Sequence, residues 1–437
     1  MGSGKSRAAR ALGGVDTDAL VEVAAGKTIP LIFREEGEAV FRALEEEQVV
    51  AALGGGAVTS PRVRDALRDT LTIWLDVDVD TCWERVKRSR RPLARDEAAF
   101  RRLYEERRAL YADVADVVAR DVHDVVLAVA GVHVERGALE RLAELVPGDG
   151  PVALVSDPHV AGIHGATAQL ALGARLTETH ELPPGEEAKT FAAVSRLWEE
   201  LRLDRRGTVV ALGGGCTTDP AGFAAATYLR GVPWVPVPTS LVAQVDAAIG
   251  GKTAIDLPQG KNLVGAFHWP TRTVVDPALL ETLSEAQRLE GMAEVVKTGL
   301  LAGEPFWELR DDELVRRCAA YKAAVCLRDP EDKGERKMLN LGHTFAHALE
   351  AAAGYDGTVT HGRAVALGLL AALRLSGRDT AVVEELLHPE PVRVDRDRAW
   401  QALLRDKKGA LKLVLLGRWD IDVPAEDVRH ELDRLIA

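Results

Sequence analysis

The stretch Thr208-Val-Val-Ala-Leu-Gly-Gly-Gly215 joins an apolar, β-branched run directly to three glycines. Such a run is typical of a buried strand, and the following Ala221-Gly-Phe-Ala-Ala-Ala226 is typical of a helix. Glycines at a strand-to-helix turn let the backbone approach a phosphate group, which the N-terminus of the helix can then bind. The stretch favours a phosphate or dinucleotide site, with a plain strand-to-helix turn as the alternative.

The sequence on either side of this stretch alternates between strand and helix patterns. Upstream, 125–130 and 132–135 are predicted to be paired strands, and Val152-Ala-Leu-Val-Ser-Asp157 a buried strand ending in a turn. The alternation continues to about residue 275, and from about residue 280 the pattern becomes helical. We expect an α/β nucleotide-binding domain with a helical domain packed against it and the active site between them.

Two histidines lie four residues apart in Asn340-Leu-Gly-His343-Thr-Phe-Ala-His347. Residues at i and i+4 share one helix face, so the two imidazoles are expected to point the same way. Glu294 is expected on a separate helix and His361 on a loop, which gives three or four ligands of the type that zinc prefers. The spacing alone leaves open whether both histidines are ligands or whether neither binds a metal. A metal-assisted enzyme is the leading hypothesis.

Composition excludes several classes of function. The 437 residues are enough for two or three domains, and 47% hydrophobic and 28% charged residues are ordinary for a globular protein. A net charge of -12 disfavours nucleic acid as a partner, and no apolar run is long enough to span a bilayer. The four cysteines fall in no paired spacing and no apolar signal region precedes them, so we expect free thiols in the cytoplasm.

The N-terminus contains part of a phosphate-binding motif. Gly2-Ser-Gly4-Lys5-Ser6 matches the end of a phosphate loop, in which backbone amides hold the phosphates, a lysine reaches the outer phosphates and a hydroxyl binds Mg²⁺. The first glycine of that motif and the strand before it are not in the sequence. A flexible glycine-serine terminus is the alternative.

The motifs that follow occur in an order that resembles shikimate kinase. They are Asp16-Thr-Asp18 with Glu22, Phe41-Arg42-Ala-Leu-Glu45, Gly54-Gly-Gly56, Arg91-Pro-Leu and Arg107-Arg-Ala-Leu-Tyr111. The resemblance implies ATP and Mg²⁺ contacts from Gly4, Lys5 and Ser6, and a Mg²⁺-side or base role for Asp16. It further implies that shikimate is bound by Asp18, Arg42 and Arg107. The backbone would approach the substrate closely at Gly54, Gly55 and Gly56, and Arg91 would come from a lid that closes over ATP. Phosphoryl transfer requires mainly positioning and charge neutralisation, which these residue types supply.

This N-terminal region departs from the family pattern in four places. The segments from Ser6 to Asp16 and from Arg42 to Gly54 are each shorter by a turn or two of helix, and neither the strand before the loop nor the usual C-terminal helix is expected. A sheet without that strand lacks hydrogen-bond partners for its neighbours and support for the loop. We therefore expect an incomplete P-loop kinase-like domain at 1–121, whose catalytic activity is an open question.

Residues 125–437 resemble 3-dehydroquinate synthase. The motifs that carry the resemblance are Pro184-Gly-Glu-Glu-Ala-Lys189, Gly213-Gly-Gly-Cys-Thr-Thr-Asp219, Tyr228-Leu-Arg230-Gly, Pro238-Thr-Ser-Leu-Val-Ala-Gln-Val-Asp246, Gly250-Gly-Lys252-Thr, Gly260-Lys261-Asn262, Ala293-Glu294-Val-Val-Lys297, Lys322, Arg336-Lys-Met-Leu-Asn340-Leu-Gly-His343 and Arg405-Asp-Lys407-Lys408. The resemblance implies that Glu294, His343 and His361 bind Zn²⁺ or Co²⁺, and that His347 is catalytic instead of a ligand.

The resemblance also implies the other site residues. The catalytic and substrate-binding set is Arg230, Asp246, Lys252, Asn262, Lys297, Lys322, Arg336, Asn340, His347 and Lys407 or Lys408. The NAD-binding set is Asp157, Glu186, Lys189, Gly213, Gly214, Gly215, Asp219, Thr239, Ser240, Asp246, Lys252 and Lys261. Thr218 stands where the family often has glycine, which bears on how closely the backbone approaches the NAD pyrophosphate.

The implied fold is an α/β NAD-binding domain at 122–278 followed by a helical metal- and substrate-binding domain at 279–437. The implied reaction converts 3-deoxy-D-arabino-heptulosonate 7-phosphate to 3-dehydroquinate and phosphate, with NAD oxidising and then reducing the substrate within one turnover. It belongs to the shikimate pathway of aromatic amino acid biosynthesis. The family also suggests a homodimer.

Three alternatives remain open from the sequence. A related sugar-phosphate cyclase that makes a valiolone or an inosose would share the NAD and metal sites. Retention of Lys322, Arg336, Asn340 and His347 favours the dehydroquinate product, because a substrate carboxylate and phosphate both need such partners. A metal-dependent polyol dehydrogenase would accumulate NADH, which a cyclase would not. Residues 1–120 could finally be a docking or stabilising module without activity.

Overall fold

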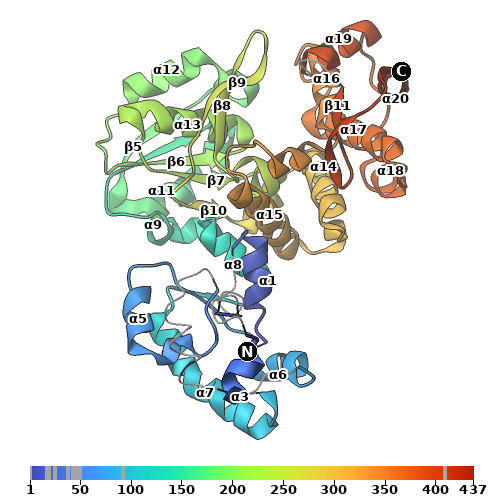
Figure 1. The fold of residues 1–437 in the computed structure, drawn as a ribbon. Coiled ribbons are helices and arrows are strands. Elements are labelled where there is room, and N and C mark those ends of the chain that lie inside the picture. Colours follow the sequence, from blue (N-terminus) through green and yellow to red (C-terminus); the bar gives the residue numbers. More distant parts are fainter. Residues whose placement is uncertain are drawn as a thin grey trace. The chain divides into compact units, whose positions relative to one another are not determined.

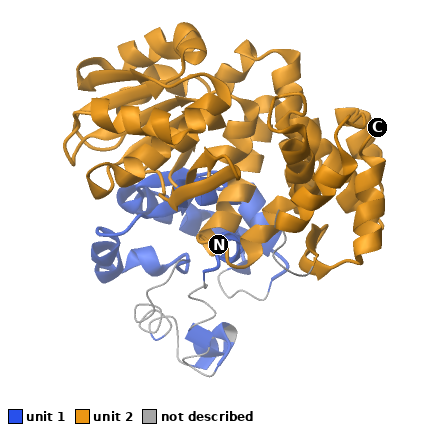
Figure 2. Ribbon diagram, turned by 90° about the horizontal axis from the view of Figure 1, so that it is seen from above, with its two compact units in different colours: residues 1–130 blue, residues 131–437 orange. Residues whose placement is uncertain are grey.

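The computed structural model describes residues 2–14, 21–22, 27–35, 40, 52–89, 94–406 and 411–437. They form two compact units, Met1–Ala130 and Gly131–Ala437 (Figure 2). The finer division of the second unit at residues 278 and 279 stays a prediction, as does the boundary at residues 121 and 122.

A parallel four-stranded sheet lies at the centre of the second unit. Its strands are β4 (Val152–Ser156), β5 (Leu176–Glu181), β6 (Thr208–Gly213) and β7 (Trp234–Pro238), in the order β5-β4-β6-β7 (Figure 1). The strands predicted at 152–157 and 208–213 are confirmed. From β4 the chain moves to one side for β5 and to the other side for β6. The carboxyl ends of β4 and β6 therefore flank a topological switch point, where open α/β sheets bind ligands.

Both faces of this sheet are covered by helices. Alternate residues such as Val155 and Val209 pack with α12 (Phe191–Glu200) and α13 (Gly215–Thr227) in one core cluster. Their neighbours Leu154 and Val210 pack in a second cluster, with α9 (Leu142–Leu145) and α11 (Ala166–Leu172) on the opposite face. Side chains alternate between the two faces of a strand, and both faces of this sheet are buried. For this reason β4 and β6 are apolar at nearly every position.

Two further pairs of strands flank the sheet. β3 (Val132–Val134) pairs in parallel with β10 (Thr273–Val275), and β8 (Lys252–Leu257) forms an antiparallel hairpin with β9 (Gly260–Phe267). The predicted pairing of 125–130 with 132–135 is wrong, because Val122–Val129 is helix α8 of the first unit. The side chain of Asp121 accepts hydrogen bonds from the backbone of His123 and Asp124 and so caps the start of this helix.

The chain after residue 284 is mainly helical, as predicted. Ser284 and Gln287 form a capping box that starts the first of these helices. The elements are α14 (Glu285–Ala302), α15 (Asp311–Arg328), α16 (His343–Ala353), α17 (His361–Leu375), α18 (Ala381–Leu387), α19 (Arg396–Asp406) and α20 (Ala425–Arg434), with an antiparallel hairpin of β11 (Lys412–Leu415) and β12 (Arg418–Asp422). Helices α16 and α17 share a core that includes Phe345, Leu349 and Leu369.

The first unit has a smaller parallel pair of strands, β1 (Ile73–Leu75) and β2 (Val117–Ala119), connected through helices. Helices α6 (Val79–Val86) and α7 (Glu97–Val114) connect the two strands, whereas α1 (Lys5–Ala11), α3 (Ile29–Glu35) and α5 (Pro61–Leu67) precede β1. Ala8, Leu75, Ala119 and Val125 form one small core. A strand, a long crossover and a parallel partner strand make an α/β arrangement in this unit as well.

Candidate active site

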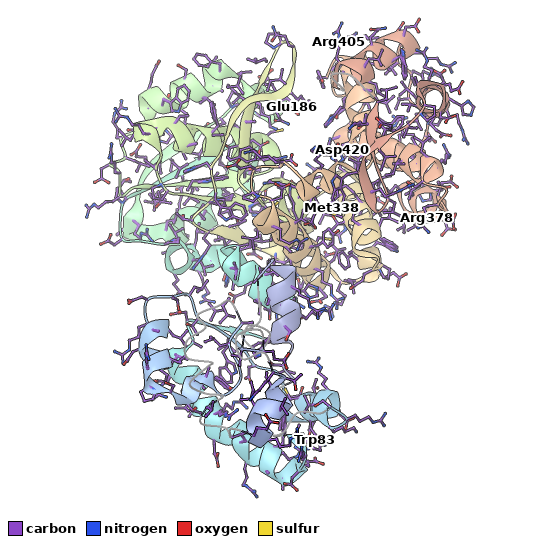
Figure 3. All side chains as sticks on the ribbon, viewed as in Figure 1. Trp83, Glu186, Met338, Arg378, Arg405 and Asp420 are labelled. Atoms are coloured by element: carbon purple, nitrogen blue, oxygen red, sulfur yellow. The ribbon has the colours of Figure 1, made fainter. Side chains whose placement is uncertain are left out.

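A cavity of about 1270 Å³ lies in the second unit. Its lining comes from the turns after the sheet strands and from the β8–β9 hairpin as well as from the helices. Glu186, in the 3₁₀ turn Gly185–Lys189, and Arg405, in α19, are two of the lining residues (Figure 3). Most of the residues predicted for the cofactor and the substrate line it: Asp157, Glu186, Lys189, Gly214, Gly215, Asp219, Thr239, Ser240, Asp246, Lys252, Lys261, Asn262, Lys297, Lys322, Arg336, Asn340, His343, His347 and His361. The cavity thus joins motifs that are as much as 200 residues apart in the chain, in line with the predicted active site between sheet and helices.

One end of the cavity is formed by the start of α13 at the switch point. Gly214 and Gly215 line the cavity, and a Cβ on Gly214 would lie 3.4 Å from the Ser240 Oγ. Asp157, directly after β4, accepts a hydrogen bond of 3.2 Å from the Thr217 hydroxyl. Gly213 does not appear in the lining, and a Cβ there would lie 2.5 Å from Thr217, so this glycine is required for packing behind the turn. The exposed amides of the helix start can bind a phosphate group.

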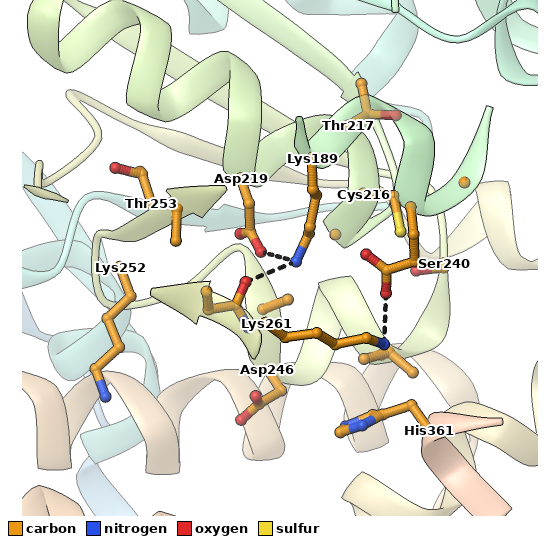
Figure 4. A pocket seen from close by; sticks show the side chains of 18 of the residues that line it. Lys189, Cys216, Thr217, Asp219, Ser240, Asp246, Lys252, Thr253, Lys261 and His361 are labelled. Atoms are coloured by element: carbon orange, nitrogen blue, oxygen red, sulfur yellow. Dashed lines mark hydrogen bonds and ion pairs between the residues drawn. The ribbon is translucent and has the colours of Figure 1, made fainter. Parts of the chain in front are cut away.

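Lys189 is buried beside this helix start. Its Nζ lies 2.6 Å from the Asp219 Oδ2 and donates a hydrogen bond of 3.1 Å to the Asn262 Oδ1 (Figure 4). Burial would lower the pKa of Lys189, but the carboxylates of Asp219 and Glu186 outweigh it and raise that pKa. Asn262 has a left-handed φ of 55°, which asparagine tolerates better than most residues. The contact ties the β8–β9 hairpin to the start of α13.

The described residues include a group of two imidazoles and one carboxylate that fits a metal ion. The ligand atoms of Glu294, His343 and His361 all lie within 4.8 Å of one another. The Nε2 atoms of His343 and His361 lie 3.4 Å and 3.3 Å from the same oxygen of Glu294. Glu294 is fully buried; burial would raise its pKa, but Lys297 and the two imidazoles hold the pKa well below its usual value.

The outer nitrogen of each imidazole also has a partner. The Nδ1 of His343 lies 3.2 Å from the Leu341 carbonyl oxygen, and the Nδ1 of His361 lies 3.6 Å from Glu350. A ligating histidine needs such an acceptor, because a proton held on Nδ1 leaves the Nε2 lone pair for the metal. One carboxylate and two neutral imidazoles are a common zinc donor set with room for a further ligand. The residues present therefore fit a divalent metal.

His347 lies on the same face of α16 as His343, as the spacing predicted. The two rings are perpendicular, with centroids 5.6 Å apart. Within the described part of the chain, the group that fits a metal does not include His347. His361 is the first residue of α17 and not part of a loop, so that prediction is wrong. Glu290 holds the start of α17 by accepting hydrogen bonds from the Thr360 hydroxyl and the Gly362 amide.

Cationic side chains crowd the cavity next to this group. Lys297 is almost fully buried and contacts both Glu294 and Asp246. Lys322 lies 2.9 Å from the Asp246 Oδ1 and donates a hydrogen bond of 2.6 Å to its carbonyl oxygen. Burial would lower the pKa of Lys297, but the two carboxylates raise it, so this lysine stays protonated.

Arg336 and Lys252 complete this cationic region. The guanidinium of Arg336 is held by the carbonyl oxygens of Gly250 (2.9 Å) and Pro330 (3.0 Å) and lies over the Phe267 ring. The Lys252 Nζ forms an ion pair with Asp332, although the lysine side chain remains about half exposed. Arg336 is thus held by backbone carbonyl oxygens and Lys252 by a carboxylate of the same chain.

Some predicted site residues are not in the cavity. Arg230 is exposed, in a 3₁₀ turn (Tyr228–Arg230) with a left-handed φ of 70°, and it is not part of the lining. Lys407 and Lys408 lie outside the described residues, as do Asp16, Asp18, Arg42 and Arg91.

The first unit brings some of the kinase-like residues together. Arg107 is buried and donates a hydrogen bond of 3.0 Å to the Gly55 carbonyl oxygen, which the Tyr111 hydroxyl also contacts. Gly4, with a left-handed φ of 106°, precedes α1, and this helix begins with Lys5 and Ser6. Gly54 and Gly56 belong to the turn that leads to a short 3₁₀ helix at Ala57–Thr59.

Three of the residues that the prediction missed are charged and lie at the site. Glu350 and Arg405 line the cavity, and Asp332 pairs with Lys252. Glu350 follows His343 by seven residues, which places both on one helix face, so the spacing contained a usable signal. Nothing in the local sequence marks Asp332, because its partner is 80 residues away.

Family models match along most of the chain. Models described as 3-dehydroquinate synthase N-terminal and 3-dehydroquinate synthase C-terminal match residues 179–290 and 291–408, and one described as Shikimate kinase matches residues 1–135. The curated 3-dehydroquinate synthase of Bordetella pertussis is 38% identical over 343 residues, which cover 69% of this chain and 95% of that protein. The chain belongs to the 3-dehydroquinate synthase family. It is an enzyme of the shikimate pathway that combines 3-dehydroquinate synthase domains with an N-terminal shikimate kinase domain.

Solved structures of related cyclases share the fold of the 3-dehydroquinate synthase part. A 2-deoxy-scyllo-inosose synthase complexed with carbaglucose-6-phosphate, NAD⁺ and Co²⁺ aligns with a TM-score of 0.62 and 26% identity, over 69% of this chain and 96% of that chain. A 2-epi-5-epi-valiolone synthase from Streptomyces hygroscopicus with NAD⁺ and Zn²⁺ bound aligns with a TM-score of 0.59 and 25% identity, over 70% and 94% of the two chains. In the described part of this chain, no helix is long and apolar enough to cross a membrane.

Proposed function

We propose that the cavity of the second unit binds NAD, a divalent metal and 3-deoxy-D-arabino-heptulosonate 7-phosphate, and releases 3-dehydroquinate and phosphate. The observation that carries the proposal is that Glu294, His343 and His361 lie within 4.8 Å of one another beside the cavity that Gly214 and Gly215 also line. An NAD- and metal-dependent reaction needs a site for the cofactor and a site for the metal in one cavity. The glycines at the start of α13 and the three metal-ligand residues supply these two sites.

The NAD pyrophosphate is proposed to bind at the start of α13. Gly214 and Gly215 leave the backbone open there, and Thr239 and Ser240, directly after β7, line the same end of the cavity. Asp157 follows β4 across the switch point. Lys189 and Lys261 are cations in the same lining and can bind anionic or hydroxyl groups of the cofactor or the substrate.

Glu294, His343 and His361 are proposed to hold Zn²⁺ or Co²⁺, with Glu350 and the Leu341 carbonyl behind the two imidazoles. When bound, the metal would act as a Lewis acid on a substrate hydroxyl and NAD would accept and return a hydride.

The side chains of the cavity are proposed to bind the two anionic groups of the substrate. Lys252, Lys322 and Arg336 can neutralise phosphate and carboxylate, and Asn340 adds a neutral donor. Asp246 holds Lys297 and Lys322 in place by ion pairs of 3.6 Å and 2.9 Å. His347 is proposed to hold or transfer a proton on its imidazole near the leaving phosphate, because it lines the cavity one helical turn after the ligand His343.

The test is phosphate release from the heptulosonate phosphate with catalytic NAD and Zn²⁺. We expect phosphate and 3-dehydroquinate in equal amounts and no accumulation of NADH. Accumulation of NADH would instead indicate a dehydrogenase. Turnover of a sugar phosphate without the carboxylate, with no turnover of the heptulosonate, would indicate an inosose- or valiolone-forming cyclase.

A second activity, ATP-dependent phosphorylation of shikimate, is proposed for the first unit. It is supported by the family model over residues 1–135 and by the buried contact between Arg107 and Gly55. Formation of ADP that depends on shikimate would establish this activity. ADP formation that is independent of shikimate, or none at all, would leave the first unit without a kinase role.

The chain is also proposed to be a homodimer in the cytoplasm. The family suggests the homodimer, and light scattering after size-exclusion chromatography would measure it as twice the mass of 47.1 kDa. All four cysteines are free, which suits a reducing compartment. Fractionation of cells with an antibody to the chain would test the location.

A further inference from the structure

Glu350 is a buried carboxylate whose two oxygens face two different cationic or proton-donating groups. It lies on α16 with an exposed fraction of 3%. Its Oε2 is 3.6 Å from the His361 Nδ1, and its Oε1 is 3.3 Å from the Lys261 Nζ. The carboxylate therefore connects an imidazole of the proposed metal group with a lysine of the β8–β9 hairpin.

Lys261 balances the negative charge of Glu350 by pairing with Oε1, which leaves Oε2 to face His361. The Lys261 Nζ is also 2.7 Å from the Glu186 Oε1 and lies 5.2 Å from the centre of the Tyr355 ring. Figure 4 shows the long side chain of Lys261 extending across the cavity toward the region of His361. A buried carboxylate needs such a cation, because an unpaired charge away from water is strongly unfavourable.

The remaining oxygen of Glu350 is placed to act on the His361 ring. With Lys261 beside Oε1 as the balancing cation, the Oε2 of Glu350 is the acceptor next to the His361 Nδ1, 3.6 Å away. An acceptor at Nδ1 keeps the ring proton on that atom. The Nε2 atom faces the Glu294 oxygen 3.3 Å away and is the ring nitrogen that a bound metal would take.

We propose that Glu350 is a positioning residue for the metal ligand His361, and that Lys261 holds Glu350 in place for this purpose. The proposal rests on the metal site assigned under the proposed function. It also means that the hairpin of the NAD-binding half contributes to metal affinity through Lys261, although no hairpin residue belongs to the ligand group. A carboxylate behind a ligating histidine typically changes metal affinity about 10- to 100-fold.

The experiment measures Zn²⁺ affinity of the full chain by competition with a chromophoric chelator. Glu350→Gln should weaken Zn²⁺ binding about tenfold and Glu350→Ala up to about a hundredfold, whereas Glu350→Asp should recover part of the loss because it restores the charge. Lys261→Met should also weaken Zn²⁺ binding. Glu431→Gln is the matched control, since Glu431 on α20 is a buried acid that pairs with Arg374 and Arg434 and lies outside the ligand group. The Zn²⁺ affinity of this variant should equal that of the unaltered chain.

A second measurement separates positioning from a general role in stability. The thermal midpoint of each metal-free variant is compared with its midpoint in excess Zn²⁺, and the visible absorption of the Co²⁺ form is recorded. Glu350→Gln should reduce the Zn²⁺-induced shift and alter the Co²⁺ bands, because the His361 ring is no longer fixed.

Three outcomes would overturn the proposal. Unchanged Zn²⁺ affinity and Co²⁺ bands in Glu350→Gln would show that Glu350 does not position His361. A lower metal-free midpoint with a normal Zn²⁺-induced shift would show a purely structural role. If the unaltered chain and His343→Ala bound Zn²⁺ equally weakly, the metal site itself would be wrong, and the proposed function would fail with it.

Discussion

His343 and His347 illustrate what the sequence can and cannot assign at the scale of single residues. Their spacing placed both on one face of α16, and the structure confirms it. Which of them belongs to a metal site depends on Glu294 and His361, which come from α14 and α17. Helix periodicity contains no information on where those two helices cross α16. A resemblance to a known family named the three ligands, and the geometry of the described residues is compatible with it.

The different roles proposed for the two histidines lead to a paired prediction. His343→Ala should remove bound Zn²⁺ and turnover together. His347→Ala should keep one Zn²⁺ per chain, while kcat falls roughly 10²- to 10⁴-fold, as expected for loss of a general acid or base. Metal content by atomic emission and phosphate release on the same samples would check both. Loss of Zn²⁺ from His347→Ala would make this histidine a ligand.

The thiol of Cys216 lines the cavity and should be unreactive. Burial raises its pKa to about 11, with Glu186 adding to the effect. Since only the thiolate reacts, about one molecule in a thousand is reactive at pH 8, and the rate of alkylation should rise about tenfold per pH unit up to pH 11. Mass spectrometry after timed iodoacetamide treatment would measure this. Protein unfolded in guanidinium is the control, and rapid modification of the folded chain at pH 7 would contradict the prediction.

At the scale of elements, the sequence predicted the buried strands correctly but misassigned a short apolar helix and the start of another helix. β4 and β6 were recognised because a strand buried on both faces is a continuous apolar run. The run at 125–130 looks similar but is part of helix α8, which Asp121 caps. His361 was expected on a loop, although Thr360 directly precedes it and threonine is a preferred residue type at the start of a helix. The hydrogen bonds that Glu290 accepts at this helix start connect residues 70 and 72 positions apart, so no local pattern reveals them.

The glycine triplet gives a prediction that separates packing from ligand binding. Gly213→Ala would place a Cβ 2.5 Å from Thr217 inside the packed turn, and the free energy of unfolding should fall by roughly 1–3 kcal/mol. Gly214→Ala would place its Cβ 3.4 Å from the Ser240 Oγ, so the chain should fold nearly normally. Its Cβ would instead extend into the cavity and weaken NAD binding. Urea denaturation and NAD titration of both variants would check this, and equal NAD affinity in Gly214→Ala and the unaltered chain would contradict it.

At the scale of the whole molecule, the order of motifs predicted a shikimate kinase domain followed by a 3-dehydroquinate synthase, and the family models confirm that order. Several of the residues predicted for the kinase site are not among the described residues. Asp16, Asp18, Arg42 and Arg91 lie outside the described residues, so only Gly55 and Arg107 are seen in contact. Asp16 and Arg42 adjoin the two segments that are shorter than the family pattern, so the resemblance alone does not assign their roles.

The two activities should be separable in one chain. The two reactions are not consecutive in the pathway, so neither site needs the product of the other. Lys5→Ala should lower shikimate phosphorylation and Lys322→Ala should lower phosphate release, each by about a hundredfold or more, as for the loss of one charge-stabilising group. Each variant should leave the other reaction unchanged. Parallel assays of both reactions on both variants would measure this, and a loss of both activities in either one would indicate that the sites depend on each other.

The cations of the cavity have a consequence for how the enzyme works over time. Lys322 is held by Asp246, and Arg336 by two backbone carbonyls, which are all parts of the chain itself. A pocket organised in this way would attract any phosphate, whether it arrives on a sugar or remains after the bond to carbon has broken. The inorganic phosphate of the cell would then compete with each new substrate molecule. Flux through the cyclisation would follow the ratio of sugar phosphate to free phosphate, so a cell rich in phosphate would slow its own supply of aromatic precursors.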